Sequence, residues 1–153
     1  MSINSETKKA LVEHLTTTID KKLSAIQQEI ADIRESMAND TKSSAGDKFE
    51  TGREMMQIEL NKNQDQLNKQ LGLKKDLAQI DLHKTHTNVD FGSLVITNKG
   101  HYFMPVALGK INVDGVEYFA LSMASPVGQA LKGAKLGDEI SFNKQRISVA
   151  AIY

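Results

Sequence analysis

The chain has 153 residues, 40% of them hydrophobic, which is enough for one ordinary domain or two small ones with a core. Its 19 basic and 19 acidic side chains cancel, which excludes a strong overall field for nucleic acid or a membrane surface. The absence of cysteine excludes disulfides, thiol catalysis and thiolate metal sites. The first residues lack the apolar core of a signal peptide and no run approaches the ~18 apolar residues of a membrane span, so we expect a cytoplasmic protein.

A long helix is predicted from Asn4 to Ala38, because this stretch contains neither proline nor glycine. Its apolar residues recur at spacings of four and three, which is the pattern of a coiled-coil seam. They are Leu11, Leu15, Ile19, Leu23, Ile26, Ile30, Ile33 and Met37. Charged and polar residues fill the remaining faces, so the pattern predicts a solvated helix with one apolar stripe.

A polar turn from Asn39 to Glu54 separates this helix from a second one. The second helix is predicted to start near Asp47, a suitable N-cap with Glu50 three residues later. Five apolar pairs have residue numbers that sum to 86 and would meet if the chain folds back about Ser43. These pairs are Met37 with Phe49, Ile30 with Met56, Ile26 with Leu60, Ile19 with Leu67, and Leu15 with Leu71. The sequence therefore predicts an antiparallel hairpin, and ~33 residues of helix place its tip roughly 50 Å from its base.

The period changes after a polar linker, His83 to Asp90. Strands are predicted at Gly92 to Thr97, His101 to Leu108, Ile111 to Val113, Val116 to Met123, Leu136 to Phe142 and Gln145 to Ile152. Ser125 and Pro126 form an N-cap and first helical residue for a short helix that Gly133 stops. The fold class is therefore α+β, with an antiparallel coiled coil in residues 1–83, a linker in 84–91, and a small antiparallel β domain with one short helix in 92–153.

The segment from Ala124 to Ile140, A-S-P-V-G-Q-A-L-K-G-A-K-L-G-D-E-I, lies between an Asp-Gly hairpin and a closing hairpin. It resembles the C-terminal domain of the Gre transcription elongation factors, which is FKBP-like in fold. In that family this domain follows an antiparallel coiled coil, and the start of the second helix here, D-K-F-E-T-G-R-E, resembles the family's second helix as well. The resemblance covers nearly the whole chain.

Members of this family bind RNA polymerase and insert the coiled coil into its secondary channel. The resemblance implies that Met123, Ala124, Ser125 and Pro126 meet the polymerase, and that the tip residues Lys42, Ser43 and Ser44 enter the channel. It implies no membrane partner, and contact with DNA or RNA only through the elongation complex. The polar surface of the coiled coil favours a monomer, although a long hairpin can also pair with a second copy.

Two acidic tip residues of the family help to hold a second Mg²⁺ in the polymerase active centre, where the polymerase cleaves its own transcript. Carboxylate oxygens are the ligands that such a hard ion requires. In this chain the two positions fall on Lys42 and Ala45, neither of which can bind Mg²⁺. The preferred hypothesis is an accessory factor, not an enzyme, with no cofactor of its own and without the usual cleavage acids.

Two alternatives remain open. In the first, the protein is an active cleavage factor whose candidate acids are Asp40, Asp47 and Glu50, with Mg²⁺ held only within the polymerase. In the second, it is an adaptor whose coiled coil binds some other partner.

Other activities are disfavoured by the residues present. His83 and His86 have a spacing that could suit a metal, but they lie at a helix end without further ligands, and we interpret them as linker residues. The scarcity of aromatic residues and the absence of tryptophan argue against a prolyl isomerase pocket. The scattered lysines and arginines argue against autonomous nucleic-acid binding.

Overall fold

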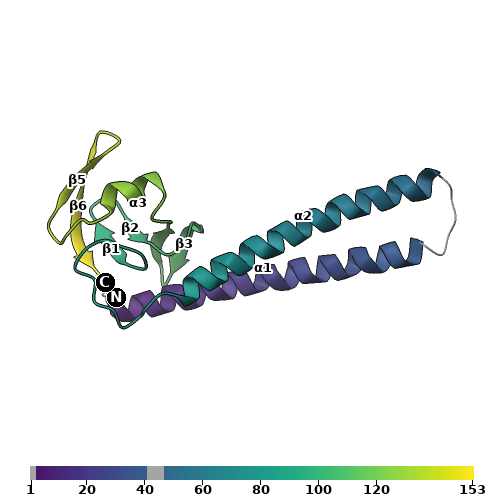
Figure 1. Cartoon of the computed structure of the whole chain (residues 1–153). Coiled ribbons are helices and arrows are strands. Elements are labelled where there is room, and N and C mark those ends of the chain that lie inside the picture. The colour runs from purple at the N-terminus through teal and green to yellow at the C-terminus, as the bar shows by residue number, and fades with distance from the viewer. Residues whose placement is uncertain (1–2, 41–46) are drawn as a thin grey trace. The chain divides into compact units, whose positions relative to one another are not determined.

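The computed structural model describes residues 3–40 and 47–153 (Figure 1). The chain divides into two compact units, one formed by residues 1–16 and 75–153 and the other by residues 17–74. The two predicted helices are present as α1 (Ser5–Asp40) and α2 (Asp47–Ala78), so helix occupies most of the predicted turn. No helix within the described ranges combines the length and hydrophobicity that a membrane span requires.

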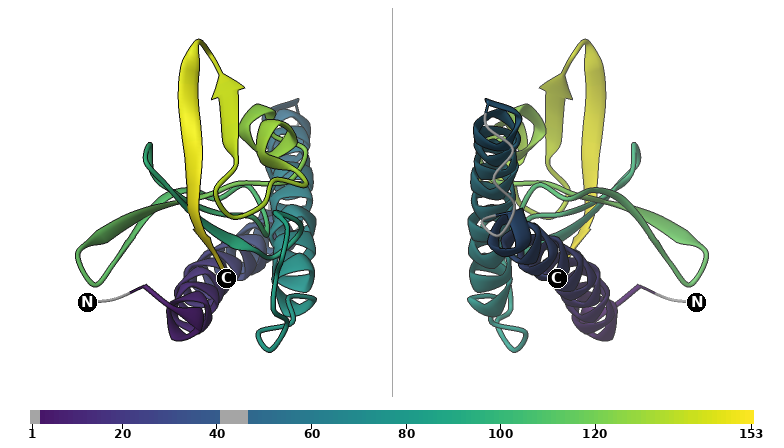
Figure 2. Two further views of the ribbon diagram at one scale, coloured as in Figure 1. Left: turned by 90° about the vertical axis from the view of Figure 1, so that its left-hand side faces the viewer. Right: turned by 90° about the vertical axis from the view of Figure 1, so that its right-hand side faces the viewer.

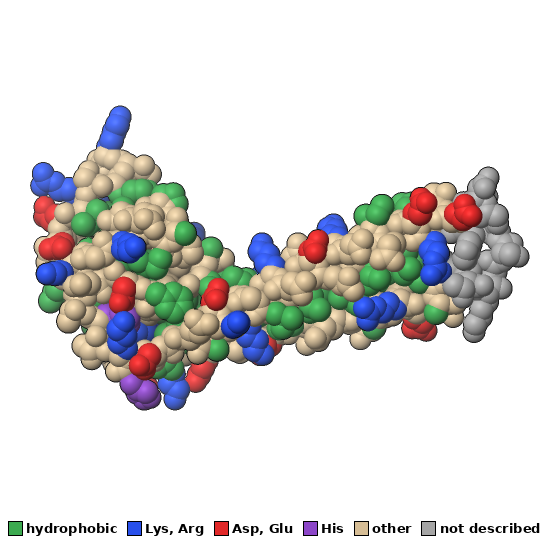
Figure 3. Space-filling model, in the orientation of Figure 1, with side chains coloured by type: hydrophobic (Ala, Val, Ile, Leu, Met, Phe, Trp, Pro, Cys, Tyr) green, Lys and Arg blue, Asp and Glu red, His purple; other side chains and the backbone are tan. Residues whose placement is uncertain are grey.

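The unit of residues 17–74 is an antiparallel pair formed by α1 and α2 (Figure 1). Its buried apolar residues include Ile19, Leu23 and Ile30, which agree with the predicted stripe on α1, and Leu60 on α2. Figure 3 shows charged side chains of both signs along these helices, as expected for helices that are solvated on their outer faces.

The predicted register of the pair is wrong by one heptad. Lys74 Nζ lies 2.7 Å from Asp20 Oδ1, and Ile30 shares a pocket with Gln64 and Leu67 rather than with Met56. Leu71, which the predicted register places in the seam, is 46% exposed. Facing residues therefore have numbers that sum to about 93, not 86. A seam that repeats every seven residues keeps the same faces together after a slip of seven, so its pattern alone does not distinguish the two registers.

The second unit contains a six-stranded sheet with the order β3-β4-β2-β1-β6-β5. The strands are β1 (Leu94–Thr97), β2 (His101–Phe103), β3 (Gly109–Val113), β4 (Val116–Ala120), β5 (Glu139–Phe142) and β6 (Gln145–Ile152). The short helix α3 (Pro126–Leu131) lies between β4 and β5 in the chain, and Figure 2 shows it beside the β5–β6 hairpin. The α+β fold class is thus confirmed.

The prediction of a wholly antiparallel sheet needs one correction, because β2 and β4 are parallel. Pro105 cannot donate a backbone hydrogen bond and follows directly after the last pairs of β2, so the chain leaves the sheet there. The Asp114–Gly115 turn, with φ of 53° and 80°, then reverses the chain, and β3 pairs outside β4. The connection from β2 to β4 spans the dozen or so residues that a parallel crossover needs.

The core of this unit lies between the sheet and α3. Its buried residues are Val89, Val95, Met104, Leu131, Ala134, Ile147 and Val149, with Tyr102, Val127 and Phe142 packed against them. Leu131 is the fully buried side chain that α3 contributes to this cluster, Val127 packs against the cluster from the first turn, and Pro126 at the start of the helix is exposed.

Candidate functional site

The turn that precedes α3 contains the predicted partner-binding residues Met123, Ala124, Ser125 and Pro126. Ser125 is the N-cap of α3, as predicted: its Oγ accepts a hydrogen bond from the Gly128 N–H at 3.0 Å. The same hydroxyl donates to the Ser122 carbonyl at 2.7 Å. Pro126 occupies the first helical position, where no N–H is required. Met123 and Ser125 are half-buried, whereas Ala124 and Pro126 are exposed.

Gly128 lets this turn pack closely against the helix, and the sequence pattern did not predict this role. A Cβ at Gly128 would lie 2.4 Å from the Ser122 carbonyl oxygen and 2.9 Å from that of Met123. The backbone of the turn therefore passes directly over the glycine. Gln129 adds a further restraint, since its Nε2 donates to the Met123 carbonyl at 2.7 Å. The sequence does contain one indication of this role, because Gly128 lies inside a six-residue helix, where glycine is otherwise unfavourable.

These contacts make the Met123–Pro126 turn a rigid surface feature. Its inner carbonyls accept hydrogen bonds from Ser125 and Gln129, while Ala124 and Pro126 present small apolar surfaces to solvent. A turn whose conformation is already fixed loses little entropy when a partner binds it. It is therefore suited to docking, and it contains no group that could perform acid–base or nucleophilic chemistry at neutral pH.

The predicted tip residues fall largely outside the described part of the chain. Lys42, Ser43, Ser44 and Ala45 belong to this undescribed segment, Asp40 is the last residue of α1 and Asp47 the first of α2. Glu50 is exposed and lines a shallow pocket with Arg53, Glu54 and Gln57. Within residues 3–40 and 47–153 no group of three histidines and carboxylates lies close enough to hold a metal ion.

A buried polar cluster joins the start of α1 to the segment before β1. Lys8, only 1% exposed, has its Nζ 2.9 Å from Nε2 of His86, and Nδ1 of His86 bonds to an Asp90 carboxylate oxygen. The other Asp90 oxygen lies 3.1 Å from Lys84 Nζ at the surface. His86 thus serves as a structural residue in contact with α1, while His83 is exposed.

Burial lowers the pKa of both bases in this cluster. For Lys8 the loss of hydration outweighs the attraction of Asp90, and its pKa lies below the usual value. For His86, burial and then the neighbouring Lys8 charge lower the pKa, against the opposing effect of Asp90. A neutral His86 that donates from Nδ1 to Asp90 and accepts from Lys8 at Nε2 satisfies all three side chains. The cluster is therefore arranged to hold the chain together, and it is closed to a substrate.

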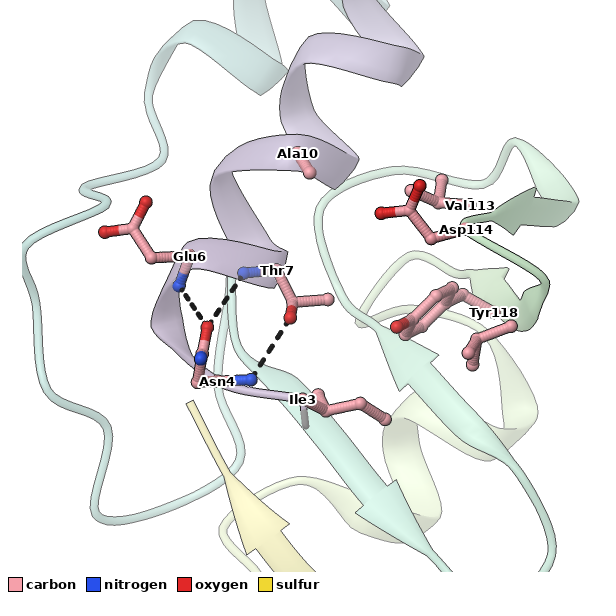
Figure 4. A pocket seen from close by; sticks show the side chains of 9 residues that line it. Ile3, Asn4, Glu6, Thr7, Ala10, Val113, Asp114 and Tyr118 are labelled. Carbon is pink, nitrogen blue, oxygen red and sulfur yellow. Dashed lines mark hydrogen bonds between the residues drawn. The ribbon is translucent and has the colours of Figure 1, made fainter. Parts of the chain in front are cut away.

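A small cavity of about 200 Å³ lies where the first turn of α1 meets the β3–β4 hairpin (Figure 4). Asn4 caps this helix, since its Oδ1 accepts from the Glu6 N–H at 2.9 Å. The opposite wall contains Val113, Asp114 and Tyr118. Burial and the nearby Asp114 carboxylate raise the pKa of Tyr118, so its hydroxyl stays protonated at neutral pH. The cavity contains no nucleophile paired with a base.

The fold and these sites define a class of protein: an antiparallel helical hairpin joined to a small α+β domain that carries an exposed, hydrogen-bonded turn before α3. No protein-family model matches the chain, and no curated protein does so either.

Among solved structures, the chain is similar to GreA factor homolog 1 (Gfh1) of Thermus thermophilus, with 18% identity and a TM-score of 0.36 over 90% of this chain and 94% of that one. A second structure of the transcription factor Gfh1 gives 18% identity and a TM-score of 0.35 over 90% and 92% of the two chains. Similarity at this level is distant and does not by itself assign a function.

Proposed function

We propose that this protein is a cytoplasmic accessory factor of transcription elongation that binds RNA polymerase and inserts its helical hairpin into the secondary channel. The observation that carries the proposal is the segment Ala124–Ile140, whose residues resemble the Gre C-terminal domain. The structure folds this segment as a capped helix followed by the first strand of a closing hairpin. The small apolar surfaces of Ala124 and Pro126 on a rigid turn suit the docking role that the resemblance implies for them.

The length of the helical hairpin supports the proposed insertion. With 36 residues in α1 and 32 in α2, each helix spans about 50 Å. The outer faces carry charges of both signs (Figure 3), so the hairpin can stay hydrated in an aqueous channel. A wholly apolar outer surface would instead favour self-association, and we therefore propose that the factor acts as a monomer.

The residues at the tip support regulation rather than stimulated cleavage. Lys42 and Ala45 occupy the positions at which the family carries its two acids, and a lysine ammonium repels the Mg²⁺ that those acids would help to hold. The proposed factor therefore blocks the channel or competes with cleavage-competent factors. It needs no cofactor, and it meets DNA or RNA only within the elongation complex.

Binding and cleavage can be tested separately. The purified protein is incubated with stalled, backtracked cognate polymerase and Mg²⁺, and both co-purification with the polymerase and the length of the RNA 3′ end are measured. We expect binding without shortening of the RNA. Shortening that is lost in Asp40→Ala or Asp47→Ala would instead establish the cleavage-factor alternative. Absence of binding would leave the adaptor alternative.

The tip residues can be tested by gain of function. The double substitution Lys42→Asp with Ala45→Glu restores both acids, and we expect it to confer transcript cleavage. The matched control is Lys42→Asn with Ala45→Gln, which has nearly the same shape without the negative charge. Cleavage by both variants, or by neither while both still bind, would contradict the role assigned to these two positions.

The docking turn can be tested by a single bulky charge. Ala124→Arg leaves the Ser125 cap intact and places a long cation on the exposed turn, so we expect a loss of polymerase binding of at least tenfold. Ala150→Arg, at an exposed position of β6, is the control. Equal binding by the two variants would exclude the turn as the docking surface.

A further inference from the structure

The seam between α1 and α2 is compatible with two alignments. In the alignment of the structure, Ile26 lies level with Leu67 and Ile33 with Leu60, in keeping with the Asp20–Lys74 ion pair and the pocket shared by Ile30 and Leu67. If α2 slips by seven residues, Ile26 lies level with Leu60 and Ile19 with Leu67. Apolar residues meet in both alignments, because a helix presents nearly the same face every seven residues.

The polar residues of the seam do not lock either alignment. Asn63 is buried, but its Nδ2 donates to the Glu59 carbonyl at 2.9 Å, within its own helix. Gln70 is also buried, and its Oε1 has no hydrogen-bond partner within the described residues. A buried polar side chain fixes a coiled-coil register when it bonds across the seam, and neither the Asn63 amide nitrogen nor the Gln70 carbonyl oxygen does so.

The ion pair that favours the alignment of the structure lies at the surface. Lys74 and Asp20 are 46% and 48% exposed, and ion pairs of this exposure contribute little to stability. The alignment of the structure also buries the unsatisfied Gln70 carbonyl opposite the apolar Leu23. After the slip, Gln70 lies level with the polar Thr16, and the Asp20–Lys74 ion pair is lost.

We propose that the helical pair of residues 17–74 populates a second register, displaced by one heptad from the register in the structure. A slip of seven residues at 1.5 Å per residue moves α2 along α1 by about 10 Å. The extent to which α2 projects past the end of α1 then changes by the same amount. The pair is a sliding element with two positions, and this inference does not depend on the proposed function.

Disulfide trapping tests the proposal. Because the chain contains no natural cysteine, only the introduced cysteines can form a disulfide. Ile26→Cys with Leu67→Cys reports the register of the structure. Ile26→Cys with Leu60→Cys reports the slipped register, since these positions are otherwise offset by about 10 Å, beyond the ~7 Å Cα separation that a disulfide spans. Ile19→Cys with Leu67→Cys is a second reporter of the slip and leaves the buried Leu60 intact.

Ile26→Cys with Ile58→Cys is the control for crosslinking through general unfolding. Ile58 is two residues from the reporter position Leu60, but it is 67% exposed and so lies outside the buried seam. Each full-length variant is oxidised, checked for native helix content by circular dichroism, and resolved as a crosslinked monomer on a non-reducing gel.

We expect both slipped-register pairs to form intramolecular disulfides more slowly than the pair that matches the structure, and at least tenfold faster than the control pair. The proposal is overturned if both slipped-register pairs stay reduced, or if they oxidise no faster than the control, while the pair that matches the structure crosslinks.

Discussion

Substitution of Gly128 by alanine should destabilise the β domain, because this buried glycine packs against the backbone of the preceding turn. A Cβ at this position would lie 2.4 Å from the Ser122 carbonyl oxygen, about 1 Å inside ordinary contact, and 3.0 Å from the Met123 carbonyl carbon. Both obstacles are backbone atoms, so the turn itself must move. Overpacking of this kind costs ~1–3 kcal/mol of folding stability. Displacement of Ser122 also weakens the Ser125 cap, whose hydroxyl bonds to the Ser122 carbonyl, and this costs ~1 kcal/mol more. We therefore expect a loss of about 2–4 kcal/mol.

Gly133→Ala is the matched control for this measurement. Gly133 has a φ of +79°, but nothing lies within 4 Å of an added Cβ. The control thus carries only the backbone strain of a left-handed alanine, about 1 kcal/mol. Urea unfolding of the two variants, followed by circular dichroism, compares them directly. Equal losses for both, or a loss for Gly128→Ala of less than 1 kcal/mol, would show that the turn does not pack over Gly128 as described.

Three further predictions concern the buried polar groups and the seam. Burial lowers the pKa of His86 in the folded protein, so the unfolded chain binds more protons than the folded chain as the pH falls below ~6.5. The free energy of unfolding should therefore have its full value above that pH and decline below it. His86→Gln should flatten this decline in urea midpoints measured from pH 8 to pH 5, whereas His83→Gln at the exposed neighbour should not. Gln70→Leu removes a buried carbonyl without a partner and should raise stability by ~1 kcal/mol, and a loss would mean that Oε1 is bonded after all. Leu60→Ala should cost ~2–4 kcal/mol and Leu71→Ala less than ~0.5 kcal/mol, because Leu60 is buried and Leu71 is 46% exposed. Comparable losses would favour the register predicted from the sequence, which places both leucines in the seam.

The elements that carry local signals were predictable from the sequence. The start of α2 at Asp47, the Asp114–Gly115 turn and the cap of α3 by Ser125 each depend on residues within a few positions of one another, and each is present. Gly128 was missed because its importance depends on how closely the preceding turn passes over the helix. The backbone path of a turn is a tertiary property that residue types alone do not specify.

The buried cluster was missed for a related reason. Lys8 lies three residues before Leu11 and seven before Leu15, on the face of the apolar stripe, but lysine is rarely buried without a partner. Its partner, His86, follows it by 78 residues, in a segment that reads as a polar linker. Only the packing of the first turns of α1 against the β domain brings the two together. The parallel pairing of β2 with β4 was unpredictable on similar grounds, because a strand pattern does not reveal which neighbour a strand selects.

Under the proposed function, docking and chemistry belong to separate parts of the chain, and this separation explains how one could be lost without the other. The Met123–Pro126 turn is held by Ser125, Gly128 and Gln129, none of which belongs to the hairpin tip. Replacement of two tip acids by Lys42 and Ala45 therefore leaves the docking surface unchanged. A factor of this kind retains its access to the polymerase and contributes a cation where a carboxylate would be needed. The expected consequence is competition: added in excess to a cleavage-competent factor, the protein should suppress transcript cleavage in proportion to its occupancy, and Ala124→Arg should abolish that suppression.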